Sequence, residues 1–214
     1  KTSAVTATTS KKTNKNNSNY FTSKDSDTSY DESSASKIKL SGSSADVSGD
    51  GVAVSGSTVT ISKAGTYVIS GKSDGVQIKV DSGDSDDVHI ILDGVTMTNT
   101  NAAINATKAG HVYLTLKDGT TNTLSDSSSN SDEDADAVIF SKGDLTINGS
   151  GTLNIDAKKN NGIKANDSLH MTGGTYKITS VGDAFNVNDE LNLMGTTMTI
   201  EAEEDAVKVD NDDD

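Results

Sequence analysis

The sequence contains no cysteine, proline or tryptophan, and all 18 of its basic residues are lysine. Without cysteine the chain can form neither a disulfide nor a thiolate metal site. Only 4% of the 214 residues are aromatic and 32% are hydrophobic, against about 45–50% in an ordinary globular domain. The longest apolar runs are Ile90–Leu92 and Ala137–Phe140, far short of the ~18 residues that a membrane-spanning helix needs. These absences predict a weakly hydrophobic domain that does not insert into a membrane.

The chain is strongly acidic. Its formal net charge is −14 at pH 7, and the sequence offers neither an arginine cluster nor a basic stripe. Because nucleic acids and anionic membranes attract proteins through such basic surfaces, we expect no nucleic-acid partner and no adsorption to membranes. The sequence also carries no signal-peptide pattern, so we expect any export signal to have been removed from this chain.

The first 36 residues differ in composition from the rest of the chain. They are almost entirely serine, threonine, asparagine, lysine and aspartate, with few large apolar side chains. Such a segment cannot bury enough apolar surface to offset the entropy of ordering it. We therefore predict a flexible tail or linker over residues 1–36 and a folded domain over residues 37–214. The linker is either a spacer that holds the domain away from a cell surface or simply a frayed terminus.

Beyond this segment the apolar residues recur with a period of two. Alternating stretches such as Val59–Ile61, Ile78–Val80 and Val95–Met97 lie between clusters of glycine, asparagine and aspartate, as β-strands do. No stretch keeps apolar residues at helical spacing. The sequence therefore predicts an all-β chain with almost no helix.

The chain also repeats itself, with a short β unit beginning at each of a series of apolar anchors. The anchors are Val88, Val112, Leu145, Leu169 and Leu191, spaced by 24, 33, 24 and 22 residues, and the longest spacing contains a Ser/Asp-rich insertion around 125–134. Three short strands in each unit of 22–24 residues predict one coil of a parallel β-helix, whose coils stack at the interstrand spacing of ~4.8 Å. A leucine-rich repeat and a β-sandwich fit less well, because the L-x-x-L-x-L-x-x-N signature and the hairpin turns are missing.

Every second residue of a strand points outward, so stacked coils align outward residues in columns. Regularly spaced polar groups on a flat β surface suit an extended polymer, although a solvated surface is the simpler interpretation. Three columns are predicted: His89, Tyr113, Thr146, His170 and Asn192; Phe140, Lys164, Asn186 and Lys208; and Asn154, Lys177 and Thr199.

Carboxylates gather at the corners of the predicted coils. In-register stacking places Asp183 under Asp205, with Glu204 beside it, and like charges on neighbouring strands are destabilising unless a cation compensates them. Calcium prefers six to eight oxygen ligands, which carboxylates and amides supply. We therefore predict calcium at this corner or in the inserted loop; the alternative is a solubilising acidic surface. The loop candidates are Asp132, Glu133, Asp134 and Asp136, and a weaker third cluster contains Asp84, Asp86 and Asp87.

One reaction would suit such corners, the calcium-assisted β-elimination of an acidic polysaccharide. Calcium would acidify the proton next to the uronate carboxylate, and a lysine with a lowered pKa would remove it. Lys164 and Lys208 are the candidate bases, since each lies about three residues from an acidic corner. The chain has no arginine to grip the uronate carboxylate, which argues against an enzyme.

Four segments carry a resemblance to a known family. They are GTYVISG (65–71), DAVIFSKGDLTINGSGTLNI (136–155), NNGIKANDSLHMTGGTYKIT (160–179) and the acidic end of the chain at 205–214. These segments resemble the carbohydrate-binding domain family of Gram-positive surface proteins, a lyase-like β-helix family described as cellulose- and acid-sugar-binding. The resemblance implies a right-handed parallel β-helix, bound calcium and binding of plant cell-wall polysaccharide. It also implies an extracellular protein that is associated with the cell surface. The departure is Asp212–Asp214, where the chain stops within a repeat.

Three functions therefore remain open from the sequence. The preferred one is a non-catalytic, calcium-stabilised polysaccharide-binding module, with Tyr113, His170, His89 and the Phe140 to Lys208 column as binding residues. The second is an extracellular filament, because neither end of the predicted β-helix carries a capping helix and open strand edges invite addition of another molecule. The third is the calcium-dependent lyase.

Overall fold

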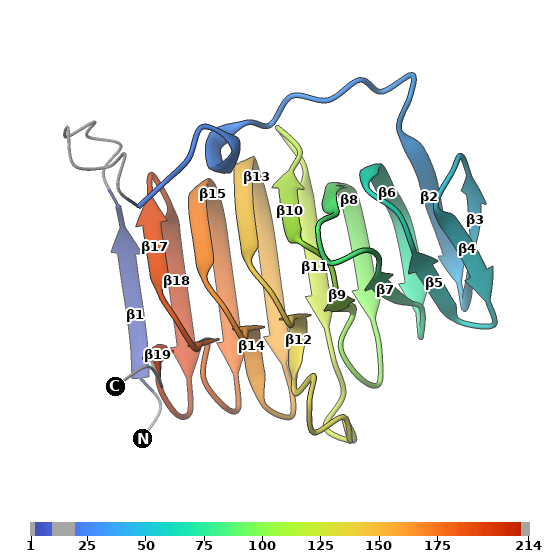
Figure 1. Cartoon of the computed structure of the whole chain (residues 1–214). Helices are drawn as coiled ribbons and strands as arrows, with labels where there is room; N and C mark the ends of the chain where they lie inside the picture. The colour runs from blue at the N-terminus through green and yellow to red at the C-terminus, as the bar shows by residue number, and fades with distance from the viewer. Residues whose placement is uncertain (1–2, 10–19, 211–214) are drawn as a thin grey trace.

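The computed structural model describes residues 3–9 and 20–210. Apart from one short 3-10 helix, η2 (Lys24–Ser26), the regular secondary structure of this part of the chain is β-strand, which confirms the all-β prediction. The strands form an 11-stranded sheet and an 8-stranded sheet, which run along the molecule as layers on either side of a common core (Figure 1). Within the described ranges, no helix has the length and apolar character needed to cross a membrane.

The two sheets share the chain between them. The larger sheet contains β1 (Ser3–Thr8), β2 (Ser36–Gly42), β3 (Ser44–Ser48), β6 (Gly65–Asp74), β8 (Asp87–Thr98), β10 (His111–Leu116), β11 (Thr121–Ser125), β13 (Leu145–Ala157), β15 (Leu169–Ser180), β17 (Leu191–Met194) and β18 (Thr197–Ala202). The smaller sheet contains β4 (Val52–Ser55), β5 (Thr58–Ile61), β7 (Gln77–Asp81), β9 (Ile104–Lys108), β12 (Ala137–Ser141), β14 (Asn161–Ala165), β16 (Phe185–Val187) and β19 (Val207–Val209).

Successive repeats pair in parallel and in register, which confirms the anchors. Val112 pairs with Val88 and with Leu145, and Leu169 pairs with Leu145 and with Leu191. The long spacing arises from residues 126–136, which lie between β11 and β12. The inward residues of both sheets form one continuous aliphatic cluster between the layers.

The predicted three strands per coil are only partly present. In β8, β13 and β15 the second and third predicted strands are one long strand, whereas β10 and β11, and β17 and β18, are separate. The long strands bend at glycine, and the register of β13 against β15 shifts between Gly149 and Thr152. Gly149 has a φ of 101° and Gly173 a φ of 84°, in the region that favours glycine, so these residues turn the strand without ending it.

Antiparallel strands, rather than a capping helix, lie at the ends of the larger sheet and at one end of the smaller sheet. At one end β2 pairs with β3 and β4 pairs with β5, and apolar residues of β3 and β4, such as Val47 and Val54, pack on the core. At the other end β1 pairs antiparallel with the edge of β18. Period-two alternation alone does not distinguish a capping hairpin from another coil, because both bury every second residue.

Parts of the first 36 residues contact the larger sheet. Ser3–Thr8 form β1, and residues 20–35, which we call the N-terminal strap, run across the larger sheet (Figure 1). The strap is polar, but Tyr30 and Ala35 pack on Val68 and Ile91, which anchor it to the sheet. Residues 1–2 and 10–19 lie outside the described residues.

Candidate functional site

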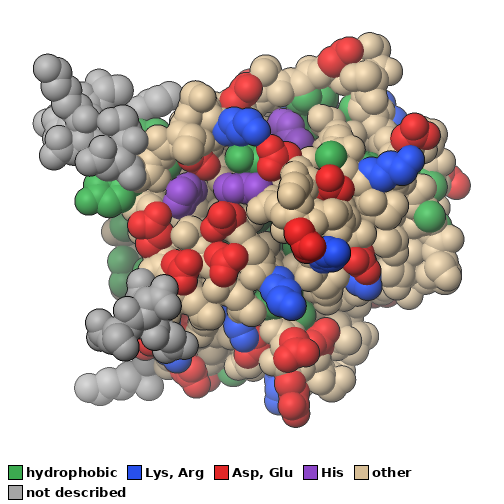
Figure 2. Space-filling model, viewed as in Figure 1, with side chains coloured by type: hydrophobic (Ala, Val, Ile, Leu, Met, Phe, Trp, Pro, Cys, Tyr) green, Lys and Arg blue, Asp and Glu red, His purple; other side chains and the backbone are tan. Residues whose placement is uncertain are grey.

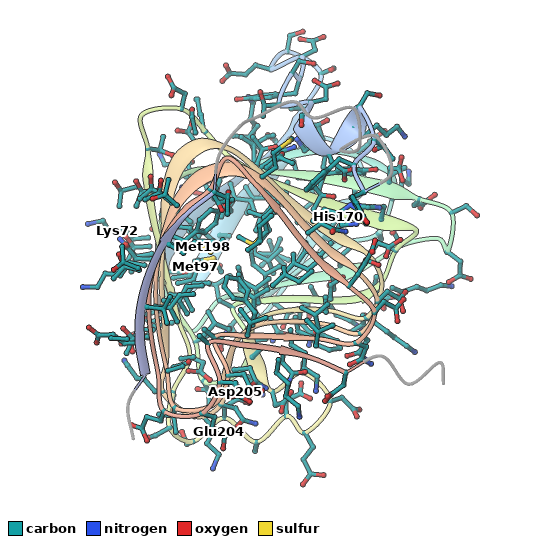
Figure 3. The ribbon with its side chains drawn as sticks, turned by 90° about the vertical axis from the view of Figure 1, so that its left-hand side faces the viewer. Lys72, Met97, His170, Met198, Glu204 and Asp205 are labelled. Carbon is teal, nitrogen blue, oxygen red and sulfur yellow. The ribbon has the colours of Figure 1, made fainter. Side chains whose placement is uncertain are left out.

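The bend at the glycines divides the outer surface of the larger sheet into two faces. The first half of each strand carries the predicted His89 to Asn192 column, which we call the histidine face. The second half carries mostly threonine, and we call it the threonine face. Figure 3 shows His170 and Lys72 on different sides of the coil, with Met97 and Met198 inside it.

The predicted histidine column exists as a row of paired residues. Tyr113 pairs with His89 and with Thr146, and His170 pairs with Thr146 and with Asn192. The imidazole Nε2 of His89 lies 2.7 Å from Thr115 Oγ1, and burial lowers the pKa of His89.

The sequence did not single out His111 as a member of this cluster. Its ring stacks on that of Tyr113 at 4.1 Å, and its Nε2 lies 2.9 Å from Thr146 Oγ1. Burial lowers the pKa of His111 and raises the pKa of Tyr113 to about 12. The lowered pKa of His89 and of His111 favours their neutral form, which suits hydrogen bonding rather than charge pairing.

The N-terminal strap covers much of this face. Asp25 is 1% exposed, and one of its carboxylate oxygens accepts a hydrogen bond of 2.6 Å from Thr146 Oγ1. The Asn148 amide donates to the main-chain oxygens of Asp25 and Asp27, and the ring of Phe21 meets His170 edge-on at 5.7 Å. An intramolecular segment thus occupies surface that the sequence assigned to carbohydrate.

His170 lies between two carboxylates. Its Nδ1 is 3.3 Å from Asp25 Oδ1, an ion-pair distance that is not aligned as a hydrogen bond, and its Nε2 is 3.4 Å from Glu190 Oε1. The interaction with Asp25 raises the pKa of His170 against the effect of burial, and Glu190 adds to the rise. Figure 2 shows histidine side chains surrounded by acidic ones on this surface.

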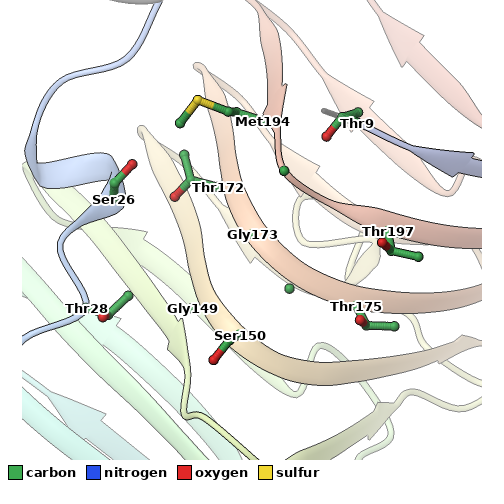
Figure 4. Close-up of a pocket in the computed structure, with 12 residues that line it drawn as sticks. Thr9, Ser26, Thr28, Gly149, Ser150, Thr172, Gly173, Thr175, Met194 and Thr197 are labelled. Carbon is green, nitrogen blue, oxygen red and sulfur yellow. The ribbon is translucent and has the colours of Figure 1, made fainter. Parts of the chain in front are cut away.

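Two hollows flank the strap. The smaller one, of about 170 Å³, contains His89 and Tyr113 on the sheet side and Lys24 on the strap side. The larger one is a groove of about 550 Å³ at the glycine bend (Figure 4). It is lined by Thr9, Ser26, Thr28, Gly149, Ser150, Thr172, Gly173, Gly174, Thr175, Met194, Gly195 and Thr197.

The groove is lined by hydroxyl side chains, glycines and one apolar side chain, Met194, and none of the described residues that line it is charged. Ser26 and Thr28 of the strap form one side, while Thr175 and Thr197 belong to neighbouring strands of the threonine face. Sequence reasoning missed this groove. A signal was present, because Gly149, Gly173 and Gly195 each follow an anchor leucine by four residues.

The threonine face continues from the groove as two regular rows. One row contains Thr121, Thr152, Thr175, Thr197 and Thr8. The next contains Lys72, Thr96, Thr123, Asn154, Lys177, Thr199 and Thr6, so it includes the third predicted column.

The predicted column on the smaller sheet is also in register, but its side chains are engaged. Phe140 is only 4% exposed, because Ala102 and Ala135 cover it, so the prediction that it faces solvent is wrong. The ammonium of Lys164 lies 2.7 Å from Asp136 Oδ1. The Asn186 amide donates to Asp183 at 2.8 Å.

Neither candidate lyase base is suited to its role. Lys164 is paired with Asp136 and largely buried beside it. Lys208 pairs with Asp210 at 3.0 Å, and that hydrogen bond raises the pKa of Lys208. A base that removes a carbon-bound proton needs a lowered pKa instead.

The predicted calcium ligands act as hydrogen-bond acceptors between coils. Asp183 Oδ1 accepts from the backbone N–H of Asp205, and Asp136 accepts from the amides of Asn160 and Asn161. Glu204 and Asp205 lie exposed at the corner (Figure 3). Within the described residues no group of three or more His, Cys, Asp or Glu is arranged to hold a metal ion.

The other acidic clusters are engaged in the same way. Asp132 Oδ1 accepts from the backbone N–H groups of Asp134 and Ala135 at 3.2 and 3.0 Å. Asp86 accepts from the N–H of Gly83, while Asp84 and Asp87 pair with Lys108 and Lys24; Glu133 is exposed. These residues do not form a preassembled calcium cage, so we derive no activity through calcium.

Comparison with known proteins identifies the family. The profile of the "Carbohydrate-binding domain-containing protein" family matches residues 55–214. A protein of that description from Acetivibrio thermocellus is 37% identical over 124 residues, which span 55% of this chain and 43% of the relative. The chain thus matches less than half of that relative's length.

A solved structure is similar as well. It is described as the polysaccharide lyase-like protein from C. thermocellum, as a gadolinium derivative, and it superimposes with a TM-score of 0.69 at 26% identity. The match covers 83% of this chain and 95% of the solved one. Because the family profile matches well over half of the sequence, this chain belongs to the carbohydrate-binding domain-containing protein family.

Proposed function

We propose that the protein binds an uncharged polysaccharide in the groove at the glycine bend, without turning it over. The observation that carries the proposal is the lining of the groove, which combines hydroxyl side chains with glycines and the apolar Met194 and lacks charged groups among its described residues. Sugars are bound by few, well-placed polar groups in such concave sites. The groove crosses β13, β15 and β18, and each strand adds ~4.8 Å, so an extended chain fits along the stack.

Charge favours a neutral glycan over a pectin-like one. The net charge of −14 repels a polyuronate, and Lys164 and Lys208 are already paired with Asp136 and Asp210. We therefore favour cellulose-like or xylan-like chains of the plant cell wall, met outside the cell by a surface-associated protein. We also infer that the coils wind as a right-handed parallel β-helix. The parallel registers support stacked coils, and crossovers between parallel strands of one sheet are almost always right-handed.

Replacing Thr175 by glutamate is expected to weaken retention by neutral polysaccharide about tenfold. The substitution places a hydrated charge at the wall of the groove, and the penalty for desolvating it exceeds ~1.4 kcal/mol. Affinity electrophoresis in gels containing hydroxyethylcellulose, xylan or polygalacturonate measures the effect. Thr179→Glu is the matched control, since Thr179 is an exposed threonine of the same strand that does not line the groove. Equal retention of both variants would contradict the proposal.

Calcium remains a prediction. If the native protein binds calcium, EDTA lowers the melting temperature, because a ligand bound only to the folded state stabilises it by mass action. An unchanged melting curve leaves the corner carboxylates with the hydrogen-bonding role described above.

Self-association also remains a prediction. The strand β19 lies at the edge of the smaller sheet, and its Val207 and Val209 are exposed. Exposed strand edges favour addition of another strand. Sedimentation at high concentration tests the filament, and a monodisperse monomer would exclude it.

A further inference from the structure

The N-terminal strap is fixed to the sheet by a buried carboxylate. Asp25 is 1% exposed and accepts hydrogen bonds from the backbone N–H and hydroxyl of Thr22 at 2.6 and 2.9 Å. From the sheet it meets the hydroxyl of Thr146 at 2.6 Å and the imidazole of His170 at 3.3 Å. His170 is the one cationic partner that the described residues supply to this carboxylate.

The two groups hold each other in the charged state. Burial alone would raise the pKa of Asp25, but the interactions with His170, Thr146 and Thr22 outweigh it and hold the pKa well below 3.8. The same pair raises the pKa of His170 above 6.5. Deprotonated His170 would leave a buried carboxylate without a counterion, which is unfavourable.

The surroundings of His170 do not replace that counterion. Glu190 approaches its other ring nitrogen, the ring of Phe21 packs on its edge, and His111 lies near enough to interact with it electrostatically. Loss of the proton therefore leaves two carboxylates around a neutral ring. Elsewhere on the strap, the ammonium of Lys24 lies 2.6 Å from Asp87 Oδ2, and this hydrogen bond raises the pKa of Lys24.

Asp25 also positions a wall of the groove. Ser26 follows it directly and, with Thr28, supplies the strap side of the groove. Motion of Asp25 away from the sheet is expected to displace both residues, because Ser26 is adjacent to Asp25 and Thr28 follows two residues later.

We propose that Asp25 and His170 form a pH-sensitive latch that keeps the strap on the sheet, and the groove complete, only while both residues are charged. This inference deepens the proposed function, on which its consequence for polysaccharide binding rests. The latch itself concerns the strap and can be tested without any ligand.

The pKa shifts of His170 and Asp25 define the range of pH in which the latch is closed. Since folding raises the pKa of His170, the stabilisation is complete below about 6.5 and is lost as the pH rises through the higher folded value. Since folding lowers the pKa of Asp25, its stabilisation is present above 3.8 and is lost only in stronger acid. The latch is thus closed in mildly acidic solution and opens as the pH rises past the raised pKa of His170.

NMR of the full chain provides the test, because the sequence has only 3 histidines and their ring signals can be resolved. We expect His170 to titrate above 6.5, and His89 and His111, which burial shifts the other way, below it. Backbone amides of the strap should be ordered at about pH 5.5 and gain fast motion at about pH 8.5. For each pKa unit by which folding raises the pKa of His170, the ratio of open to closed strap is about tenfold larger when His170 is deprotonated than when it is protonated.

Asp25→Asn keeps the shape of the side chain and removes its charge. In this variant we expect His170 to titrate lower than in the parent chain and the strap to be mobile at both pH values. Asp27→Asn is the matched control, because Asp27 is exposed two residues along the strap and should leave the pH dependence unchanged. The latch is overturned if His170 titrates below 6.5, or if the parent strap stays equally ordered at both pH values.

Polysaccharide retention separates this result from the proposed function. If the latch and the proposed polysaccharide binding are both correct, the parent chain retains less hydroxyethylcellulose at about pH 8.5 than at about pH 5.5. In Asp25→Asn the retention no longer depends on pH. Retention that is unaffected by pH while the strap loosens would overturn the link between latch and groove. No retention at any pH, with a strap that still responds, would reject the proposed function and leave the latch intact.

Discussion

Replacing Gly149 by alanine is expected to lower the free energy of unfolding by about 3–5 kcal/mol. Gly149 turns β13 at the bend, with a φ of 101° that a residue with a Cβ rarely adopts. A Cβ built there would lie 2.2 Å from the main-chain oxygen of Leu116, which is paired with Gly149 in the neighbouring strand. Relief of this contact requires movement of the backbone of β10 or β13, which adds to the cost of the strained φ.

Urea denaturation followed by circular dichroism measures this loss. Gly119→Ala is the matched control, because Gly119 also has a positive φ, of 70°, but no atom lies within 4 Å of the added Cβ. It should cost about 1 kcal/mol, so the difference between the two variants isolates the steric contact. Equal losses would show that the bend does not depend on close approach of the strands.

Replacing Asn122 by alanine is expected to lower the free energy of unfolding by about 3 kcal/mol. Asn122 is fully buried, in the same inward row as Leu153 and Tyr176. Its Oδ1 accepts hydrogen bonds of 3.0 Å from the backbone N–H groups of both Gly94 and Val95, one coil away. Alanine would leave these donors without their partner, and each unsatisfied buried group costs about 1–3 kcal/mol.

The Asn122 prediction is tested by thermal and urea unfolding beside Asn154→Ala. Asn154 is half-buried on the outer surface, and its amide makes one long hydrogen bond of 3.4 Å, so its loss should cost less than about 1 kcal/mol. If the Asn122 variant is as stable as the Asn154 variant, water or a local rearrangement must supply the acceptor for the backbone N–H groups of Gly94 and Val95.

Asn122 shows why the interior of the stack is specific as well as apolar. The aliphatic rows and the bend glycines recur from coil to coil, so they do not by themselves distinguish one coil from the next. Asn122 is different, because its side chain accepts from the backbone N–H groups of Gly94 and Val95 in one particular coil. It therefore favours one pairing of coils over a pairing shifted by one repeat.

The sequence by itself determined the repeating part of the fold. Period-two alternation and the anchors at Val88, Val112, Leu145, Leu169 and Leu191 sufficed to predict an all-β chain and the in-register rows of the two sheets. Both signals can be read from short stretches of sequence. Once equivalent anchors pair between neighbouring strands, the position of every other residue in those strands follows. The outward columns followed for the same reason.

Tertiary structure decided what those columns touch. The polar strap gave no signal of its place, since Asp25 gains its partners Thr146 and His170 only across more than a hundred residues of chain. Phe140 alternates outward as predicted, yet the inserted loop covers it through Ala135. The groove likewise forms where Thr9, Ser26 and Thr175 meet, three residues from separate parts of the chain. Contacts between distant segments depend on how the layers pack, and a repeat pattern carries no information about that.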